Sequence, residues 1–246
     1  MDIGKIHPEV SIDSFTKHDG TILFFNFVRA LIGKTKNPKV LDFGAGRGSF
    51  HHLKSSVYSH ELQNLQTTGA EVWATDVDAI VKTHPCSDHQ VVLQIGEKLP
   101  FDDNTFDVVV SDFVFEHIDS PKDVASELLR ITKPNGWVCA RTPNKWGYVT
   151  LASRIVPNAL HAKLLKRVQP KRKEKDVFPT VYKLNSPRDI RRSFPSCRVK
   201  WYYHSGDPAY HFGCGILYRM LLVLHRMLPP KLSTCACFFI QKPNRK

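Results

Sequence analysis

Residues 40–48 read Val40-Leu41-Asp42-Phe43-Gly44-Ala45-Gly46-Arg47-Gly48, and this stretch decides the fold. An apolar, β-prone run over Lys39–Phe43 stops at a cluster of glycines, and a helix-compatible stretch follows. This order predicts a strand, a tight turn and a helix, the unit that places backbone N–H groups beside a ligand. Glycine suits such a turn because it takes positive φ without strain and lets a ligand approach the backbone closely.

The spacing of the glycines narrows the class of ligand. A dinucleotide fingerprint requires a glycine at position 49, where this chain has Ser49. A phosphate-binding P-loop would end in Gly-Lys-Ser/Thr, and this sequence does not. Asp-x-Gly-x-Gly-x-Gly after a buried strand instead resembles motif I of the class I S-adenosylmethionine-dependent methyltransferases.

Further blocks in the right order strengthen this resemblance over about residues 38–144, where the chain is similar to the Methyltransf_11-like branch, of a bacterial type with undefined substrate. The blocks are Leu99-Pro100-Phe101, Phe106–Ser111, Glu116-His117-Ile118 and Lys133-Pro134-Asn135-Gly136. The resemblance implies an α/β, Rossmann-like fold. Its seven-stranded, mostly parallel sheet has an antiparallel last strand, and helical insertions are added. It also implies S-adenosyl-L-methionine as the cofactor.

We expect four segments. Residues 1–36 form an N-terminal tail and helix, and 37–141 form the cofactor-binding core. Residues 142–185 form a basic helical cap, with short helices expected over Tyr148–Val156 and Ala159–Val168. Residues 186–246 complete the sheet and place an apolar helix between its last two strands.

The residue after the second apolar strand is the candidate ribose ligand. Asp76 directly follows the run Val72-Trp73-Ala74, and a carboxylate at this strand tip accepts hydrogen bonds from both ribose hydroxyls. Asp78 is expected to cap the helix that starts near Ala79.

The resemblance implies the rest of the cofactor set. Family members often carry an Asp beside the adenine, where this chain has Ile95 and Gly96, so backbone groups or Glu97 must serve. The implied cofactor-binding residues are Asp42, Gly44, Ala45, Gly46, Gly48, Asp76, Val77, Gly96, Glu97, Asp112 and Phe113.

His117 is the candidate catalytic residue, because a neutral imidazole after the fourth strand can accept a proton from a substrate hydroxyl. The alternative is that Glu116 and His117 only begin a helix or pack. Ubiquinone-type O-methyltransferases hold magnesium at this point with Glu-x-x-Glu-His. This chain has Phe113 at their first Glu, so no metal is predicted.

The charge is distributed unevenly along the chain. Residues 1–141 hold 14 Lys and Arg against 19 Asp and Glu, whereas residues 142–246 hold 21 against 4, for a total of +12. The acidic part suits a cofactor with a sulfonium and an ammonium group. The basic part, which includes a basic run over 163–175, indicates an anionic partner: an acidic substrate, a phospholipid surface or a nucleic acid.

The apolar stretch Tyr210–Leu228 is too interrupted for a membrane span, because Arg219, His225 and Arg226 lie within it. Burial against the fold is the first interpretation, and docking at a membrane interface is the alternative. The mixed N-terminus and the scattered cysteines favour a cytoplasmic protein with free thiols, with peripheral membrane contact as a variant.

The sequence therefore predicts a methyltransferase acting on a small or lipid-like, anionic acceptor, with O-methylation favoured. Two alternatives stay open: an RNA or protein methyltransferase, and a non-catalytic protein that keeps the fold and binds membrane or nucleic acid. The strand-four motif Asn/Asp-Pro-Pro-Tyr of base- and amide-methylating enzymes is replaced by Asp112-Phe113-Val114-Phe115.

Overall fold

The computed structural model describes residues 1–48, 56–155, 179–208 and 210–244. Seven strands form one sheet in the order β3-β2-β1-β4-β5-β7-β6. Neighbours from β3 to β5 pair in parallel, and β7 runs antiparallel to β5 and β6. The predicted fold class is confirmed. The strand order reverses between β1 and β4, which is where parallel sheets of this kind bind ligands.

Strands and helices alternate along the first two thirds of the chain. The strands are β1 (Lys39–Phe43), β2 (Glu71–Asp76), β3 (His89–Val92), β4 (Phe106–Asp112), β5 (Thr132–Pro143), β6 (Arg198–His204) and β7 (Cys235–Gln241). The α-helices are α1 (Gly20–Ile32), α3 (Val57–Gln63), α4 (Pro121–Ile131), α5 (Tyr148–Ile155), α7 (Pro187–Ser193) and α8 (Gly215–Met227). The 3-10 helices are η1 (Ile3–Lys5), η2 (Pro8–Ser11), η3 (Leu65–Thr68), η4 (Ala79–Thr83), η5 (Phe115–His117) and η7 (Pro230–Leu232).

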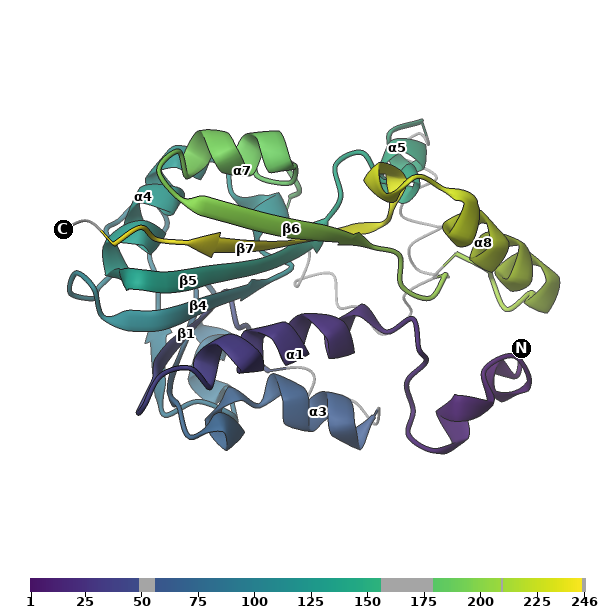
Figure 1. The fold of residues 1–246 in the computed structure, drawn as a ribbon, viewed down its shortest axis with the longest axis horizontal. Helices are drawn as coiled ribbons and strands as arrows, with labels where there is room; N and C mark the ends of the chain where they lie inside the picture. Colours follow the sequence, from purple (N-terminus) through teal and green to yellow (C-terminus); the bar gives the residue numbers. More distant parts are fainter. Residues whose placement is uncertain (49–55, 156–178, 209, 245–246) are drawn as a thin grey trace.

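Helices cover both faces of the sheet (Figure 1). On one face, α1 and α3 pack on Val108 and Val110 of β4, and on the other face α4 and α7 pack on Val109. The alternation follows from the period of two along a strand, and burial on both faces explains the continuous apolar run of β4. The core therefore consists of two layers that hold the strand ends rigidly.

Strand β5 and helix α8 do not begin where the sequence pattern alone indicates. Strand β5 includes the Lys133–Gly136 block: it begins at Thr132, which pairs with Phe106 across an irregular register, and Asn135 takes a φ of 62°. Helix α8 begins at Gly215 rather than Tyr210, because Phe212 and Gly213 take positive φ and interrupt a helix.

The expected burial of α8 is wrong. Only Tyr218 and Leu222 of this helix are buried, since α1, α3, α4 and α7 already cover the sheet. Figure 1 shows α8, α5 and the N-terminal turns beyond the carboxyl ends of the parallel strands. The expected helix over Ala159–Val168 and the basic run over 163–175 lie outside the described residues. In the part of the chain that is described, no helix is both long and apolar enough to span a membrane.

A clamp from α4 fixes the loop that follows β3. The Arg130 guanidinium donates to the carbonyls of Leu99 (2.9 Å) and Phe101 (2.7 Å), and its Nε donates to Glu127 (2.8 Å). Glu127 in turn accepts from the Leu99 N–H at 2.8 Å. These bonds hold the Leu-Pro-Phe segment against the core, directly after the turn expected to face the adenine.

We expect Arg130→Met to lower the free energy of unfolding by about 2 kcal/mol, because two carbonyls and Glu127 lose a charged donor that is largely shielded from solvent. Chemical denaturation measures this change. Lys122→Met, at an exposed position of the same helix, is the matched control and should change stability by less than about 0.5 kcal/mol. Equal effects of the two variants would contradict the clamp.

Candidate cofactor-binding site

Three candidate carboxylates meet at the carboxyl edge of the sheet. Asp42 is the fourth residue of β1, whereas Asp76 and Asp112 end β2 and β4. The two latter strands both pair with β1, so their ends lie on either side of it. Residues separated by tens of positions in the sequence are thus neighbours, as the topology requires.

The glycine turn is bonded to the end of β2. The N–H groups of Gly44 and Ala45 donate to the Thr75 carbonyl at 2.8 and 2.9 Å. The Gly46 N–H donates to Asp76 Oδ2 at 2.9 Å. The turn and the carboxylate therefore form one unit, and the first backbone donors of the turn face β2.

Asp76 keeps acceptor capacity for a ligand. Among the described residues its second oxygen accepts one hydrogen bond, from the Asp78 N–H at 2.9 Å. An ionised carboxylate accepts about four hydrogen bonds, so two sites remain after Gly46 and Asp78 are counted. Two neighbouring hydroxyls, as on a ribose, match that remainder. Asp78 also caps η4 through Ile80, as the sequence predicts.

The glycines serve different purposes. A Cβ at Gly44 would lie 2.3 Å from the Val114 side chain, and one at Gly48 would lie 2.9 Å from His84. At Gly44 and Gly48 the missing Cβ makes room for a neighbouring protein side chain. The sequence analysis expected room for a ligand at these glycines. At Gly46 a Cβ would meet, among the described residues, only Asp76 Oδ2 at 4.0 Å, so Gly46 presents the bare backbone surface of the turn.

Asp42 has a raised pKa. Burial, followed by the negative charges of Asp112 and Asp76, raises the pKa of Asp42 from 3.8 to about 7. The cause is general: desolvation and like charges both disfavour the ionised carboxyl group. A cation placed among these carboxylates would relieve both effects, so the edge is electrostatically suited to a positively charged ligand.

Arg141, which the sequence interpretation did not single out, neutralises Asp112. Its guanidinium donates two bonds of 2.6 Å to Asp112 from Nε and Nη2, and a third of 3.0 Å to Thr21. Phe113 follows at a φ of 57°, with the Arg141 guanidinium carbon 4.8 Å from its ring centroid. A bulky residue with positive φ is strained, and such strain clusters at functional sites.

The expected adenine side is more open. Val77 is exposed beside Asp76, and Gly96 and Glu97 lie in an exposed turn. That turn belongs to the same edge, because the Leu93 N–H donates to the Asp76 carbonyl at 2.7 Å. The described contacts therefore join the loop after β3 to the end of β2, and none of them runs from the side chain of Val77 or Glu97 to Asp76.

His117 lies in η5, just past β4. Its Nδ1 lies 2.9 Å from the Pro179 carbonyl, which can only accept, so Nδ1 carries a proton, and its Nε2 lies 4.0 Å from Glu116 Oε1. The ring is anchored beside a buried network in which Thr142 donates to Glu116 at 3.0 Å and Asn185 donates to Thr142. With Nδ1 bonded to Pro179, Nε2 is the nitrogen at which a neutral ring would accept a proton.

The N-terminal tail crosses the same edge of the sheet. Asp13 accepts from Ser56 at the start of α3, Thr16 donates to Asp207, and the His18 carbonyl lies 2.8 Å from the ring of His204 at the end of β6. Only scattered polar residues in the first twenty positions could have signalled these contacts.

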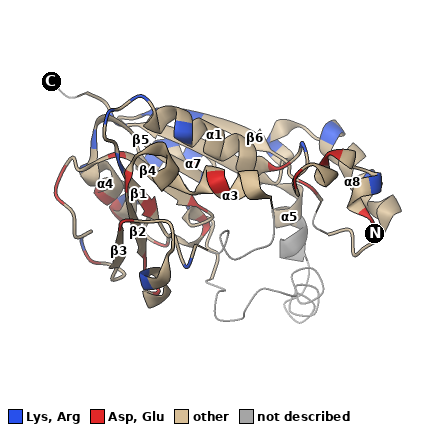
Figure 2. Cartoon of the chain, turned by 90° about the horizontal axis from the view of Figure 1, so that it is seen from below, with Lys and Arg blue, Asp and Glu red and all other residues tan. Residues whose placement is uncertain are grey.

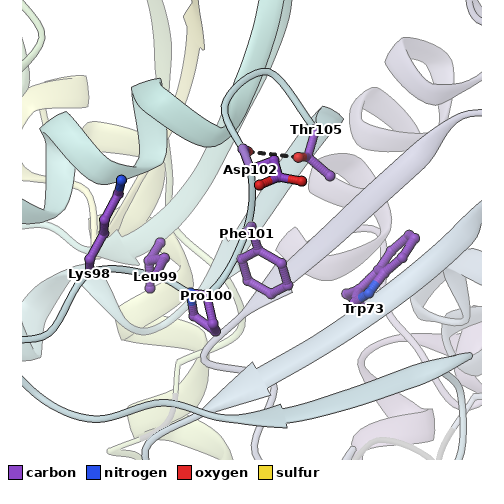
Figure 3. Close-up of a pocket in the computed structure, with 7 residues that line it drawn as sticks. All are labelled: Trp73, Lys98, Leu99, Pro100, Phe101, Asp102 and Thr105. Carbon is purple, nitrogen blue, oxygen red and sulfur yellow. Dashed lines mark hydrogen bonds between the residues drawn. The ribbon is translucent and has the colours of Figure 1, made fainter.

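A cavity of about 380 Å³ lies elsewhere (Figure 3). Trp73 lies within β2, and Thr105 precedes β4, so the cavity faces the amino ends of the strands. Its lining residues are Trp73, Lys98, Leu99, Pro100, Phe101, Asp102 and Thr105. It is separate from the glycine turn, and we assign it no part in the site.

Comparisons with known proteins agree with the geometry. Residues 41–140 match the family model described as Methyltransferase domain, Methyltransf_11. An uncharacterized methyltransferase of Mycolicibacterium gilvum is 33% identical over 109 residues, which cover 44% of this chain and 40% of that protein. A demethylmenaquinone methyltransferase of Renibacterium salmoninarum is 31% identical over 108 residues, covering 43% and 41%. The chain thus spans less than half the length of these two relatives.

A solved SAM-dependent methyltransferase from Archaeoglobus fulgidus has the same fold, with a TM-score of 0.52 at 16% identity, covering 91% of this chain and 100% of that one. The matched range begins within β1 and ends within β5, so it contains the glycine turn and all three edge carboxylates. Residues 41–140 therefore form a Methyltransf_11 methyltransferase domain similar to those of class I S-adenosylmethionine-dependent methyltransferases, and the cofactor of this domain is S-adenosyl-L-methionine.

Proposed function

We propose that this chain transfers a methyl group from S-adenosyl-L-methionine to a small or lipid-like, anionic acceptor, with oxygen as the favoured acceptor atom. One observation carries the proposal: Asp76 is bonded to the Gly46 N–H and retains two acceptor sites where strand order reverses. Among the charged residues described at this edge, only Asp76 both lies beside an uncovered glycine backbone and keeps hydrogen-bond acceptor sites for a sugar.

Different residues of the site would bind different parts of the cofactor. Asp76 would hold the ribose hydroxyls, and Gly46 would lie against the nucleoside. Asp42 and Asp112 would face the cationic end, where two hydrogen bonds from Arg141 hold Asp112 in place. When bound, the cofactor supplies a methyl group already activated by its sulfonium, so the protein mainly positions reactants, excludes water and removes a proton where needed.

The acceptor is inferred from charge and from His117. The basic second part of the chain favours an anionic acceptor, and the Nε2 of a neutral ring beyond β4 suits the removal of a hydroxyl proton. The name of the Renibacterium relative supports a second candidate, transfer to a quinone-like ring. The product distinguishes the two, because an O-methyl ether and a C-methyl group differ in their NMR shifts.

Asp76→Ala should weaken S-adenosylmethionine binding by about a hundredfold or more, because two hydrogen bonds to a charged group are lost. Isothermal titration calorimetry measures the dissociation constant. Asp78→Ala removes a carboxylate two residues away that only caps η4, and it should bind within about threefold of the unmodified protein. The prediction fails if the two variants bind alike.

Activity is tested with the same proteins. The full chain is incubated with methyl-labelled cofactor and fractionated cell extracts, and label in the products is compared with that from Gly46→Arg, which fills the bare surface of the turn. We expect labelled small or lipid-soluble products from the unmodified chain only. Label in RNA or protein instead would overturn the acceptor class, and tight cofactor binding with no labelled product in any fraction would count against transfer itself.

The raised pKa of Asp42 predicts a pH dependence of stability. Because the folded state favours the protonated carboxyl group, the stability from this group is complete below about pH 4 and is lost as pH rises through about 7. Relative to Asp42→Asn, the unmodified protein without cofactor should lose about 2 kcal/mol of unfolding free energy between about pH 5 and about pH 8. Denaturation at each pH measures the difference.

The control for this experiment is Asp102→Asn, which alters an exposed turn. Its difference from the unmodified protein should stay constant with pH. If the Asp42→Asn difference were equally constant, the carboxylates would not be coupled as described.

His117→Asn tests proton removal separately from packing. Asn can still donate to the Pro179 carbonyl from the position of Nδ1, but it offers no basic nitrogen. We expect kcat to fall about a hundredfold or more while the cofactor dissociation constant stays unchanged. Steady-state kinetics on the identified acceptor checks this, and a kcat within about twofold of the original would assign His117 to packing.

A further inference from the structure

Helix α8 presents an apolar stripe to solvent. Its outward side chains are between 38% and 78% exposed, and they recur every three or four residues, so they share one face of the helix. They are Ile216, Met220, Val223, Leu224 and Met227, which we call the α8 stripe. The face with Tyr218 and Leu222 is buried, so the helix is apolar on both sides and only one side has a partner among the described residues.

The stripe continues beyond the helix. Phe212, just before α8, is 54% exposed. The Met1 side chain lies against the start of the helix, with its sulfur 3.6 Å from where a Cβ of Gly215 would be, and Met1 is itself exposed. An exposed apolar patch of this length, formed by two segments distant in sequence, marks an interaction surface.

The inner face of α8 is fixed, so the stripe cannot turn inward. The Tyr218 hydroxyl donates to Asp207 at 2.7 Å, and His225 Nε2 lies 2.6 Å from the Tyr148 hydroxyl of α5. The His7 ring packs edge-on against Tyr218, which ties the N-terminal tail to the same face. The N-terminal tail is therefore attached to α8, and Met1 lies next to the α8 stripe.

The exposed charged side chains of α8 itself are all basic, whereas the acids Asp207 and Glu9 lie near Tyr218 on its inner face. Arg219 and Arg226 are exposed and seven residues apart, so they lie on the same margin of the helix, and Lys231 is exposed just after it. No Asp or Glu follows Asp207 in the sequence. Figure 2 shows the basic positions of α8 in blue beside the N-terminus. The basic margin of the stripe favours a partner that offers apolar surface and negative charge together.

We propose that the α8 stripe docks on an anionic lipid bilayer, with the helix in the plane of the surface. The stripe would enter the boundary between headgroups and acyl chains, and the arginines would contact lipid phosphates. A helix of 13 residues is about 20 Å long, too short to cross a bilayer and suited to lying on one. The surface is distinct from the cofactor site, and the proposal does not depend on methyl transfer.

The position of α8 determines which edge of the sheet would face the bilayer. The helix lies beyond the carboxyl ends of the parallel strands (Figure 1). The glycine turn follows β1 and η5 follows β4, so both lie at this edge of the sheet. Docking through the stripe brings this edge toward the bilayer, where an acceptor carrying an acyl or prenyl-type chain would be held. A water-soluble acceptor would gain nothing from this orientation.

Vesicle co-sedimentation of the full chain tests the proposal. The vesicles are phosphatidylcholine alone and phosphatidylcholine mixed with phosphatidylglycerol. We expect binding to the mixed vesicles, at least tenfold weaker binding to phosphatidylcholine alone, and a loss of affinity with added salt because part of the attraction is screened. Equal binding to both kinds of vesicle, or binding to neither, would overturn the proposal.

Two pairs of variants separate the apolar and the charged contributions. Met220→Glu with Met227→Glu should weaken binding at least tenfold, whereas Val57→Glu, at a comparably exposed position on α3, should not. Arg219→Gln with Arg226→Gln should weaken it about thirtyfold, since each basic residue at the surface contributes about fivefold. Arg192→Gln with Lys200→Gln removes the same charge from exposed positions elsewhere and should have little effect.

The same proteins distinguish the other occupants of the stripe. Sedimentation velocity of the full chain should show no self-association that Met220→Glu abolishes. Such self-association without vesicle binding would mean that the stripe joins two copies of the chain. Because all substituted side chains are exposed, circular dichroism should be unchanged, and the arginine pair keeps the test valid if a Glu variant unfolds.

Discussion

The hydrogen bond between the Gly46 N–H and the Asp76 carboxylate is the constraint on which the site depends. Together with the two N–H groups that reach the Thr75 carbonyl, it fixes the glycine turn to the tip of the second strand. A side chain at position 44 would collide with Val114, so the same turn is also seated on the loop after β4. Backbone geometry, rather than a set of catalytic side chains, brings the three strand ends together.

Electrostatics at this edge follow from that geometry. Three carboxylates are drawn close, which is unfavourable unless one is neutralised or one takes up a proton. The structure does both: Arg141 pairs with Asp112, and the pKa of Asp42 is raised to about 7. The repulsion among the three carboxylates lowers the stability of the folded protein without cofactor. A cationic cofactor bound beside them would reduce this repulsion, and binding sites commonly lower stability in this way.

The sequence was sufficient for the features that depend on local pattern. The run Lys39–Phe43, the glycine spacing and Asp76 after an apolar strand predicted the sheet and a carboxylate at the end of β2 beside the turn, because period and turn chemistry are local. It missed Arg141, whose partner lies 29 residues away on the neighbouring strand. The sequence analysis also wrongly predicted that α8 is buried, because a helix packed on a core and a helix with an exposed apolar face can have the same composition.

A crystal structure of the full chain with S-adenosylhomocysteine tests the central claim most directly. We expect both ribose hydroxyls within hydrogen-bond distance of the Asp76 carboxylate, with the Gly46 N–H still bonded to Oδ2 and the nucleoside against Gly46. A nucleoside bound at a different edge of the sheet, or a ribose whose hydroxyls make no contact with Asp76, would contradict it.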